Sequence, residues 1–513
     1  MSASSMLESY AKRILSARVY EAAIETPLSS APLLSERLHN HVLIKREDLQ
    51  PVFSFKIRGA YNRMVQLSPE QREKGVITAS AGNHAQGVAL AARQMGIKAV
   101  IVMPQITPDI KVKAVRARGA EVVLHGDAFN DALEHARHLQ QEYGYTYVPP
   151  FDDPDVIAGQ GTVAMEILRQ YQKPIDAVFI QVGGGGLIAG MAAYIKYLHP
   201  DIRVIGVEPE DAACLKAALD AGEPVNLPTV GLFAEGVAVA RIGEDPFKVA
   251  KECVDEVITV STDEICAAVK DIFEDTRGLA EPSGAVSLAG LKKYVQRDEV
   301  RDQTLICVNS GANTNFDRLQ GIAERTQVGE QREAILAVTI PEGPGNFKSF
   351  CRIISDRMVT EFNYRYSDPH EARIFVGLQV QPNGQDRMDI ITSLRDAGYP
   401  VEDLSDNELA KVHVRHIGGG RGPQEKAGDL EEVLYRFEFP ERPGALLNFL
   451  DHLPESWNLS LFHYRNHGDA YGRVLAGLYV PSHEIEGLES LLDTIGYSFW
   501  NETDNPAYNL FLR

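Results

Sequence analysis

The sequence is short of cysteine, and its five cysteines form no CxxC pair. They are Cys214, Cys253, Cys266, Cys307 and Cys351. An odd number of widely spaced cysteines argues against a disulfide framework and against a zinc site, and is typical of a reducing compartment. The segment Met1–Glu8 also lacks the basic start and the apolar core of a signal peptide. We therefore expect a cytoplasmic protein.

Long hydrophobic runs are absent as well, and positive charge is scarce. Apolar stretches such as Leu187–Ala193 are far shorter than the roughly 20 residues that cross a bilayer. The 513 residues carry 71 acidic and 51 basic side chains, which gives a formal net charge of -20. A surface so acidic repels phosphate backbones and anionic lipids, so we expect no nucleic acid and no membrane as a partner.

Up to about residue 320, short β-branched runs alternate with longer amphipathic stretches. This alternation predicts an α/β domain with a mostly parallel sheet that helices cover on both faces. The predicted strands are residues 41–45, 76–78, 99–102, 121–124, 177–180, 204–207, 257–260 and 305–308. Before them, apolar residues near helical spacing predict a helix over residues 9–25. Ligands of such folds bind at the carboxyl ends of the strands.

Three of these strand ends are rich in glycine and polar residues: Ala79–Gly87, Gln181–Leu187 and Val308–Asn313. The glycine tetrad Gly183–Gly186 stands between a strand and a helix, where free backbone N–H groups can bind a phosphate. The tetrad does not fit the P-loop pattern, and the acidic residue of a dinucleotide fingerprint is not evident. A monophosphate is therefore favoured over ATP or NAD, and a flexible hinge is the alternative interpretation.

A fourth segment, Ser54–Ala60, sets Lys56 between Phe55 and Ile57. A lysine must lose its proton before it can react, which costs about 4.6 kcal/mol at neutral pH from a reference pKa near 10.4. Apolar neighbours and the cationic Arg58 are compatible with a lower cost. The alternative is an ordinary surface lysine. A reactive lysine, a phosphate site, and an Asn and a Ser at strand ends together fit pyridoxal phosphate.

The chain after residue 333 contains a duplicated module. Ile340–Gly345 matches Phe439–Gly444, and Phe362–Arg365 matches Phe462–Arg465, about 100 residues further on in both cases. Each copy has the order of a βαββαβ unit with helices on one face of its sheet. The expected divisions are a catalytic domain at 1–320, a connecting helix at 321–333, a first copy at 334–412, a linker at 413–430 and a second copy at 431–513.

As a set, these motifs resemble the threonine dehydratases (threonine ammonia-lyases), which use pyridoxal phosphate and have the tryptophan synthase β-like fold, called fold type II. The motifs that carry the resemblance are Ser54–Ala60, Ser80–Gly87, Gly183–Leu187, Glu281–Ala285 and Ser310–Asn313. The duplicated half looks like the paired ACT-like regulatory modules of the biosynthetic form. The resemblance thus implies an α/β catalytic domain with twisted, mostly parallel sheets, and an α+β regulatory domain of two modules.

The resemblance also implies a role for each residue of the site. Lys56 would hold the cofactor as an imine and take the Cα proton of the substrate, while Asn83 would meet the phenolic oxygen and Ser310 the ring nitrogen. The phosphate would be held by Gly183, Gly184, Gly185, Gly186 and Leu187. The substrate carboxylate would be held by Ser80, Ala81, Gly82 and His84. For His84 a structural role is the alternative, and no metal is implied.

The implied reaction is β-elimination of L-threonine to 2-oxobutanoate and ammonia, the first step of isoleucine biosynthesis, with L-serine as a candidate second substrate. The implied effectors are isoleucine as inhibitor and valine as its antagonist, in a homotetramer. Tyr364 and Tyr464, at equivalent places in the two copies, are candidates for effector contact or else core aromatics of a strand. The alternatives are a sister enzyme, such as serine dehydratase, cysteine synthase or threonine synthase, and a non-catalytic amino-acid sensor.

Overall fold

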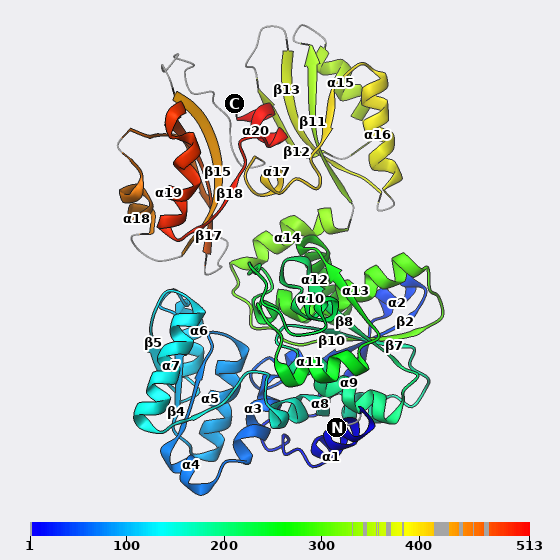
Figure 1. The fold of residues 1–513 in the computed structure, drawn as a ribbon. Helices are drawn as coiled ribbons and strands as arrows, with labels where there is room; N and C mark the ends of the chain where they lie inside the picture. Colours follow the sequence, from blue (N-terminus) through cyan, green and yellow to red (C-terminus); the bar gives the residue numbers. More distant parts are fainter. Residues whose placement is uncertain are drawn as a thin grey trace. The chain divides into compact units, whose positions relative to one another are not determined.

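The computed structural model describes residues 3–330, 332–341, 346–354, 357, 359–365, 371–381, 384–414, 430–440, 445–454, 456–465 and 471–512. The chain divides into two compact units, Met1–Asn315 and Phe316–Arg513 (Figure 1). Among the residues so described, none of the helices has the length and apolar character needed to cross a membrane.

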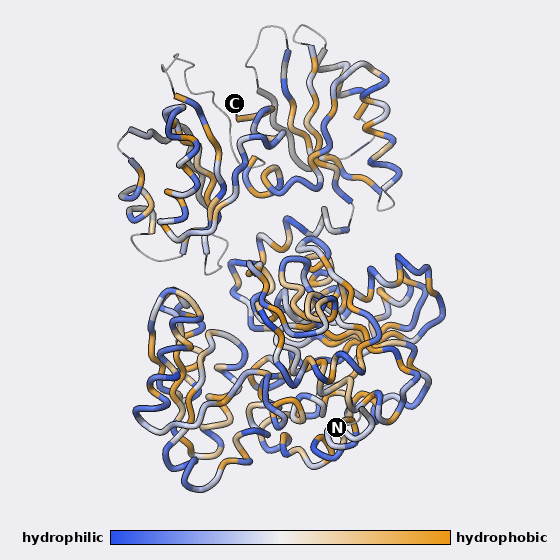
Figure 2. Tube along the Cα trace, in the orientation of Figure 1, coloured by the Kyte–Doolittle hydropathy of each residue, from blue (hydrophilic) through white to orange (hydrophobic). Residues whose placement is uncertain are grey.

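The first unit is built on a six-stranded sheet in the order β1-β2-β10-β7-β8-β9, parallel except for β1 at one edge. Its strands are β1 (Leu28–Ser30), β2 (His41–Arg46), β7 (Ala177–Gln181), β8 (Arg203–Pro209), β9 (Glu256–Val260) and β10 (Thr304–Asn309). Figure 2 shows these strands mostly in the colours of hydrophobic residues. Such strands are apolar along their length because helices cover both of their faces.

Two groups of helices cover this sheet. The first group packs against Val178 and Ile306 and consists of α1 (Ala3–Leu15), α8 (Pro154–Gln170), α9 (Gly186–Leu198), α10 (Cys214–Ala221) and α11 (Glu244–Cys253). On the other face lies α13 (Pro282–Asp298), whose Tyr294 ring is 5.3 Å from the ring of Phe179, and α12 (Thr262–Thr276) packs against α13. The predicted parallel sheet with helices on both faces is therefore confirmed.

A second, four-stranded parallel sheet has the order β5-β4-β3-β6. Its strands are β3 (Val76–Ala79), β4 (Ala99–Met103), β5 (Glu121–Leu124) and β6 (Thr146–Tyr147). One core joins it to α3 (Lys56–Val65), α5 (Asn83–Met95) and α6 (Asp109–Arg116), and a second core joins it to α7 (Phe129–Tyr143). The unit also has α2 (Pro32–Leu38), α4 (Pro69–Lys74) and the 3-10 helices η1 (Glu47–Leu49), η2 (Glu210–Ala212) and η3 (Glu235–Val237).

The prediction of a helix over residues 9–25 is wrong, because α1 begins at Ala3 and ends at Leu15. Ile14 belongs to the core of the six-stranded sheet, whereas Val19 belongs to the core of the four-stranded sheet. A single straight helix cannot supply both cores, so the chain leaves the helix between them. Leu15, at the end of α1, is 65% exposed.

The second unit contains the two repeated modules, each with a four-stranded antiparallel sheet. The first consists of β11 (Glu333–Pro341), α15 (Asn346–Ile354), β12 (Val359–Arg365), β13 (Glu371–Gln379), α16 (Gln385–Asp396) and β14 (Val401–Asp403). The second consists of β15 (Leu430–Pro440), α18 (Ala445–His452), β16 (Asn458–Arg465), β17 (Tyr471–Pro481), η5 (Ser482–Gly487), α19 (Leu488–Ile495) and β18 (Ser498–Asn501). The predicted order βαββαβ is thus confirmed in both copies.

Each module also ends in a short helix that the sequence did not reveal, α17 (Glu408–Val412) and α20 (Pro506–Phe511). Asn407 and Asn505 cap these helices, and Asn407 Nδ2 donates to Asn505 Oδ1 at 3.1 Å. Side chains of both helices share one core with strands of both modules. Helix α14 (Arg318–Gly329) precedes the modules, and most of the predicted linker at 413–430 lies outside the described residues.

Candidate active site

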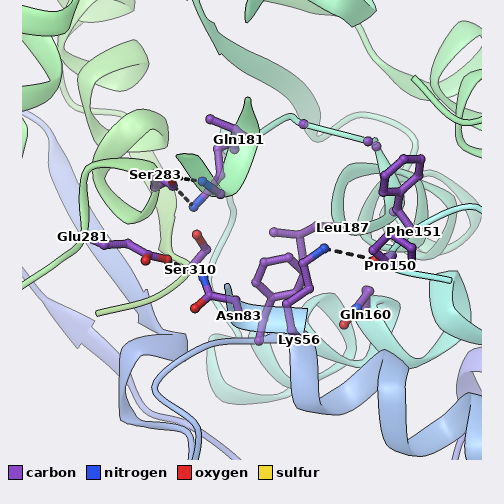
Figure 3. A pocket seen from close by; sticks show the side chains of 17 residues that line it. Lys56, Asn83, Pro150, Phe151, Gln160, Gln181, Leu187, Glu281, Ser283 and Ser310 are labelled. Carbon is purple, nitrogen blue, oxygen red and sulfur yellow. Dashed lines mark hydrogen bonds between the residues drawn. The ribbon is translucent and has the colours of Figure 1, made fainter. Parts of the chain in front are cut away.

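A pocket of about 490 Å³, its open mouth included, lies where the carboxyl ends of β7 and β10 meet the first residues of α3 and α5. The side chains around it converge from segments far apart in the sequence (Figure 3). The lining includes all the residues predicted to hold the cofactor, which are Lys56, Asn83, Gly183, Gly184, Gly185, Gly186, Leu187 and Ser310. Residues Ser80, Ala81 and Gly82 follow β3 beside Asn83 and are half-buried.

Lys56 is the first residue of α3, and its Nζ donates to the carbonyl oxygen of Pro150 at 3.0 Å. Burial lowers the pKa of the Lys56 ammonium to about 8, although the carboxylate of Glu281 acts in the opposite direction. A group with such a pKa is neutral in about a tenth of the molecules at pH 7, far more often than an exposed lysine. The amine can therefore act as a nucleophile or a base.

Arg58 does not contribute to this lowered pKa, contrary to the expectation from the sequence. Its guanidinium donates to Glu47 at 2.7 Å and to Glu166 at 2.6 Å, and Lys45 donates to Glu166 at 2.6 Å. All four side chains are fully buried. Two cations and two carboxylates balance, so Arg58 presents no free positive charge to Lys56. The network instead ties α3 to α8 and to the end of β2.

The loop Gly183–Gly186 joins β7 to α9 and has no room for side chains. A Cβ on Gly184 would lie 2.1 Å from the ring of Phe151, and a Cβ on Gly183 would lie 2.9 Å from Cα of Val237. Gly185 has a φ of +89°, in the left-handed region that favours glycine. The first N–H groups of α9 have no partner within the helix, and these residues line the pocket. Such a loop fits a phosphate group.

Asn83 lies at the start of α5 and Ser310 directly follows the end of β10, and both line the pocket. The Asn83 amide is held in place, because its Nδ2 donates to Glu281 Oε1 at 2.5 Å and its Oδ1 accepts from Asn313 at 2.6 Å. The carbonyl oxygen of Ser310 accepts from the N–H of Phe55 at 3.2 Å, next to Lys56. The side chain of Asn83 and the backbone of Ser310 are thus fixed relative to the lysine.

His84 has a different position from the residues that surround it in sequence. It is buried, and its Nε2 lies 2.9 Å from the carbonyl oxygen of Val148. Burial, together with the charge of Lys56, lowers the pKa of His84 to about 3. The ring is therefore neutral, and its Nε2–H donates to the carbonyl. This placement favours the structural role for His84 over contact with the substrate.

Phe151 and Glu281 are among the pocket residues to which the sequence assigned no role. Phe151 packs against the glycine loop, and Glu281 accepts from Asn83 across the pocket. Phe151 follows two prolines, which is a local signal for a rigid loop, but no sequence pattern says that this loop meets the glycines. The side chains of Tyr364 and Tyr464, the candidate effector contacts on β12 and β16, lie outside the described residues.

Comparisons with known families and proteins agree with this site. The family of pyridoxal-phosphate dependent enzymes matches residues 19–311. The C-terminal regulatory domain of threonine dehydratase matches residues 324–414 and 424–512. The biosynthetic L-threonine dehydratase of Burkholderia multivorans is 54% identical over 506 residues, covering 98% of this chain and 99% of the relative. That of Escherichia coli is 56% identical over 503 residues, covering 98% and 97%.

Solved structures give the same picture. The processed form of threonine deaminase isoform 2 from Solanum lycopersicum has a TM-score of 0.61 and 50% identity, covering 62% of this chain and 93% of its own. Serine racemase from Dictyostelium discoideum has a TM-score of 0.54 and 31% identity, covering 61% and 99%. The chain therefore belongs to the pyridoxal-phosphate dependent enzymes of fold type II and, within them, to the biosynthetic threonine dehydratases.

Proposed function

We propose that this chain catalyses the β-elimination of L-threonine, the first step of isoleucine biosynthesis. The β-hydroxyl leaves as water, and water then hydrolyses the released enamine to 2-oxobutanoate and ammonia. The observation that carries the proposal is the placement of Lys56, an amine with a lowered pKa, in the same pocket as a glycine loop shaped for a phosphate. The relatives described above are threonine dehydratases, which favours threonine over the substrates of sister enzymes.

The test of this proposal is turnover by the purified protein supplied with pyridoxal phosphate. Release of 2-oxobutanoate from L-threonine is the expected result, and L-serine, sulfide with an activated serine, and phosphoester substrates are the comparisons. Faster turnover of one of those substrates would indicate a sister enzyme. A protein that binds the cofactor but turns over none of them would be the non-catalytic sensor.

Pyridoxal phosphate is the cofactor of the family, and the residues of the pocket fit it. Lys56 would bond its aldehyde carbon, the loop from Gly183 to Leu187 would hold its phosphate, and Asn83 and Ser310 would donate or accept at the edges of its ring. When bound, the cofactor withdraws electrons from the substrate Cα and makes the Cα proton acidic. The Ser310 hydroxyl is neutral, so no charge of this residue opposes or assists that withdrawal.

The chain's own residues then move the proton and orient the substrate. The Lys56 amine, when neutral, accepts the Cα proton as a general base. Its hydrogen bond to the Pro150 carbonyl fixes the position of Nζ. The turn of Ser80, Ala81 and Gly82 would hold the substrate carboxylate through backbone N–H groups and the Ser80 hydroxyl, at the start of the helix that begins with Asn83.

Exchange of Glu281 for glutamine should shift the pH dependence of cofactor uptake. The Glu281 carboxylate favours the ammonium form of Lys56, so its removal lowers the pKa of Lys56 further below about 8. Only the neutral amine bonds the aldehyde, so the uptake rate rises as pH rises through this pKa and levels off above it. The midpoint should lie at lower pH in Glu281→Gln than in the parent protein.

Stopped-flow absorbance of cofactor-free protein mixed with pyridoxal phosphate, between about pH 6 and about pH 10, measures these midpoints. Glutamine keeps an oxygen that can accept from Asn83, so the variant changes the charge and little else. Equal midpoints in the two proteins would contradict the role given to Glu281.

We also propose that the second unit, with its two modules, senses isoleucine and that valine opposes it, in a homotetramer. Ending the chain after residue 330 should leave threonine turnover and remove the response to isoleucine. Allosteric coupling of roughly 1 to 3 kcal/mol changes apparent affinity about 5- to 150-fold, a range that inhibition curves resolve. Inhibition of the shortened chain by isoleucine would place the sensor in the first unit instead.

A further inference from the structure

Besides the start of α3 with Lys56, two parts of the first unit contribute residues to the active-site pocket. The small lobe, defined here as residues 76–148 with the four-stranded sheet, supplies Asn83, which directly follows the turn Ser80–Gly82. The large lobe, defined as residues 149–315 with most of the six-stranded sheet, supplies the glycine loop and Ser310. A substrate held by the small lobe and a cofactor held by the large lobe react only if the lobes stand at the right separation.

An ion pair joins the two lobes beside this pocket. Lys111, in the first turn of α6, belongs to the small lobe, and its Nζ donates to Glu235 Oε2 of the large lobe. Glu235 begins η3, and the two residues that follow it, Gly236 and Val237, line the pocket. The side chains are only 16% and 34% exposed, so water and salt screen the pair less than they screen a pair at the open surface.

We infer that Lys111 and Glu235 form an interlobe clasp, a pair of positioning residues that holds the small lobe over the substrate. An interaction made in only one arrangement of two lobes shifts the balance toward that arrangement, and breaking it shifts the balance back. The clasp keeps the turn of Ser80 to Gly82 at the distance at which it reaches the substrate carboxylate. This inference rests on the proposed function for its substrate, and it assigns neither residue a contact with substrate or cofactor.

The test compares Lys111→Met with a matched control, Lys196→Met. Lys196 pairs with Asp255 at 2.8 Å, and these side chains are 13% and 36% exposed, almost as in the clasp. Both members of the control pair belong to the large lobe, so the control loses an ion pair of similar exposure without loosening the lobes. It also loses the bonds from Lys196 Nζ to the carbonyl oxygens of Pro200 and Ile202, which makes it a stringent control for general damage. Lys111→Met should raise KM for threonine about three- to tenfold, with kcat at least half that of the parent protein. Lys196→Met should change neither constant by more than about twofold.

Two further measurements separate a clasp from general damage. Lys111→Arg keeps the positive charge, so its KM for threonine should be close to that of the parent protein and below that of Lys111→Met. Raising NaCl from about 50 to about 500 mM should raise KM of the parent protein and leave that of Lys111→Met unchanged. Equal KM values for Lys111→Met and the parent, or a parallel loss of kcat in both methionine variants, would overturn the inference.

A measurement that does not depend on catalysis tests the clasp separately from the proposed function. Amide hydrogen exchange in α6 and η3 of the cofactor-free protein should be faster in Lys111→Met and unchanged in Lys196→Met. If the parent protein released no 2-oxobutanoate, the proposed function would fail, and this exchange experiment would still decide on the clasp. Unchanged exchange in α6 and η3 of Lys111→Met would count against it.

Discussion

Lys56→Arg is expected to lose threonine turnover by at least about a thousandfold, the loss that follows when an enzyme is deprived of both its covalent anchor and its base. A guanidinium stays protonated at any working pH and offers no free amine to an aldehyde or to a Cα proton. The pocket lowers the pKa of the lysine to about 8, but the same burial cannot bring an arginine near neutrality. Initial rates of 2-oxobutanoate release at saturating threonine and cofactor measure the loss.

A second variant shows whether turnover is lost because the amine is missing or because the protein no longer binds the cofactor. Lys56→Ala leaves the glycine loop, Asn83 and Ser310 untouched, so it should still bind pyridoxal phosphate through the phosphate group. Added methylamine should restore part of its turnover, because a small amine can replace the missing one in the space left by the side chain. Turnover by Lys56→Arg above about a hundredth of the parent rate would contradict the role given to the lysine.

The architecture could be predicted because its signals are local. A β-branched run followed by glycine or serine is visible within about ten residues, and parallel strands bring their carboxyl ends to one edge of a sheet whatever their order. The segments around Asn83, Gly183 and Ser310 were found in this way, and they meet in one pocket. The duplication was visible because the same short motifs recur about 100 residues apart.

The remaining features depend on contacts that sequence spacing does not encode. Arg58 looked like a cation that assists Lys56, but its partner Glu166 is 108 residues away. The predicted N-terminal helix extends too far along the chain, because the apolar residues of this segment belong to two different cores. Helices α17 and α20 have five and six residues, too few for a helical period to show. The contact between Phe151 and the glycine loop is likewise a product of the tertiary fold.

Arg58→Met is expected to lower the free energy of unfolding of the first unit by about 3 to 5 kcal/mol, the usual result of removing one partner from a buried ion network. The change leaves Glu47 and Glu166 with Lys45 as their cation in a fully buried site. Arg63→Met, seven residues from Lys56 on the same helix, is the control, because the pair of Arg63 with Asp153 is partly exposed. It should cost about 1 kcal/mol or less.

The loss of unfolding free energy in Arg58→Met should also depend on pH. The buried carboxylates determine whether this loss grows or shrinks as pH rises. Burial pushes the pKa of Glu47 up, and in the parent protein Arg58 and Lys45 more than offset this, so that the pKa lies below its ordinary value. Without Arg58, burial prevails and the folded-state pKa rises above the unfolded one. Proton uptake then stabilises the folded variant at low pH, and this stabilisation is lost as pH rises through the raised pKa. The parent protein, with its lowered pKa, keeps its full contribution above the ordinary pKa of the carboxyl.

The difference in the free energy of unfolding between Arg58→Met and the parent protein should therefore be larger near about pH 8 than near about pH 5. Urea unfolding followed by far-ultraviolet circular dichroism at both pH values measures it. The only two tryptophans of the sequence, Trp457 and Trp500, belong to the second unit, so their emission reports that unit separately and should change little. A cost for Arg58→Met no greater than that for Arg63→Met would mean that the network does not hold α3, and with it Lys56, in place.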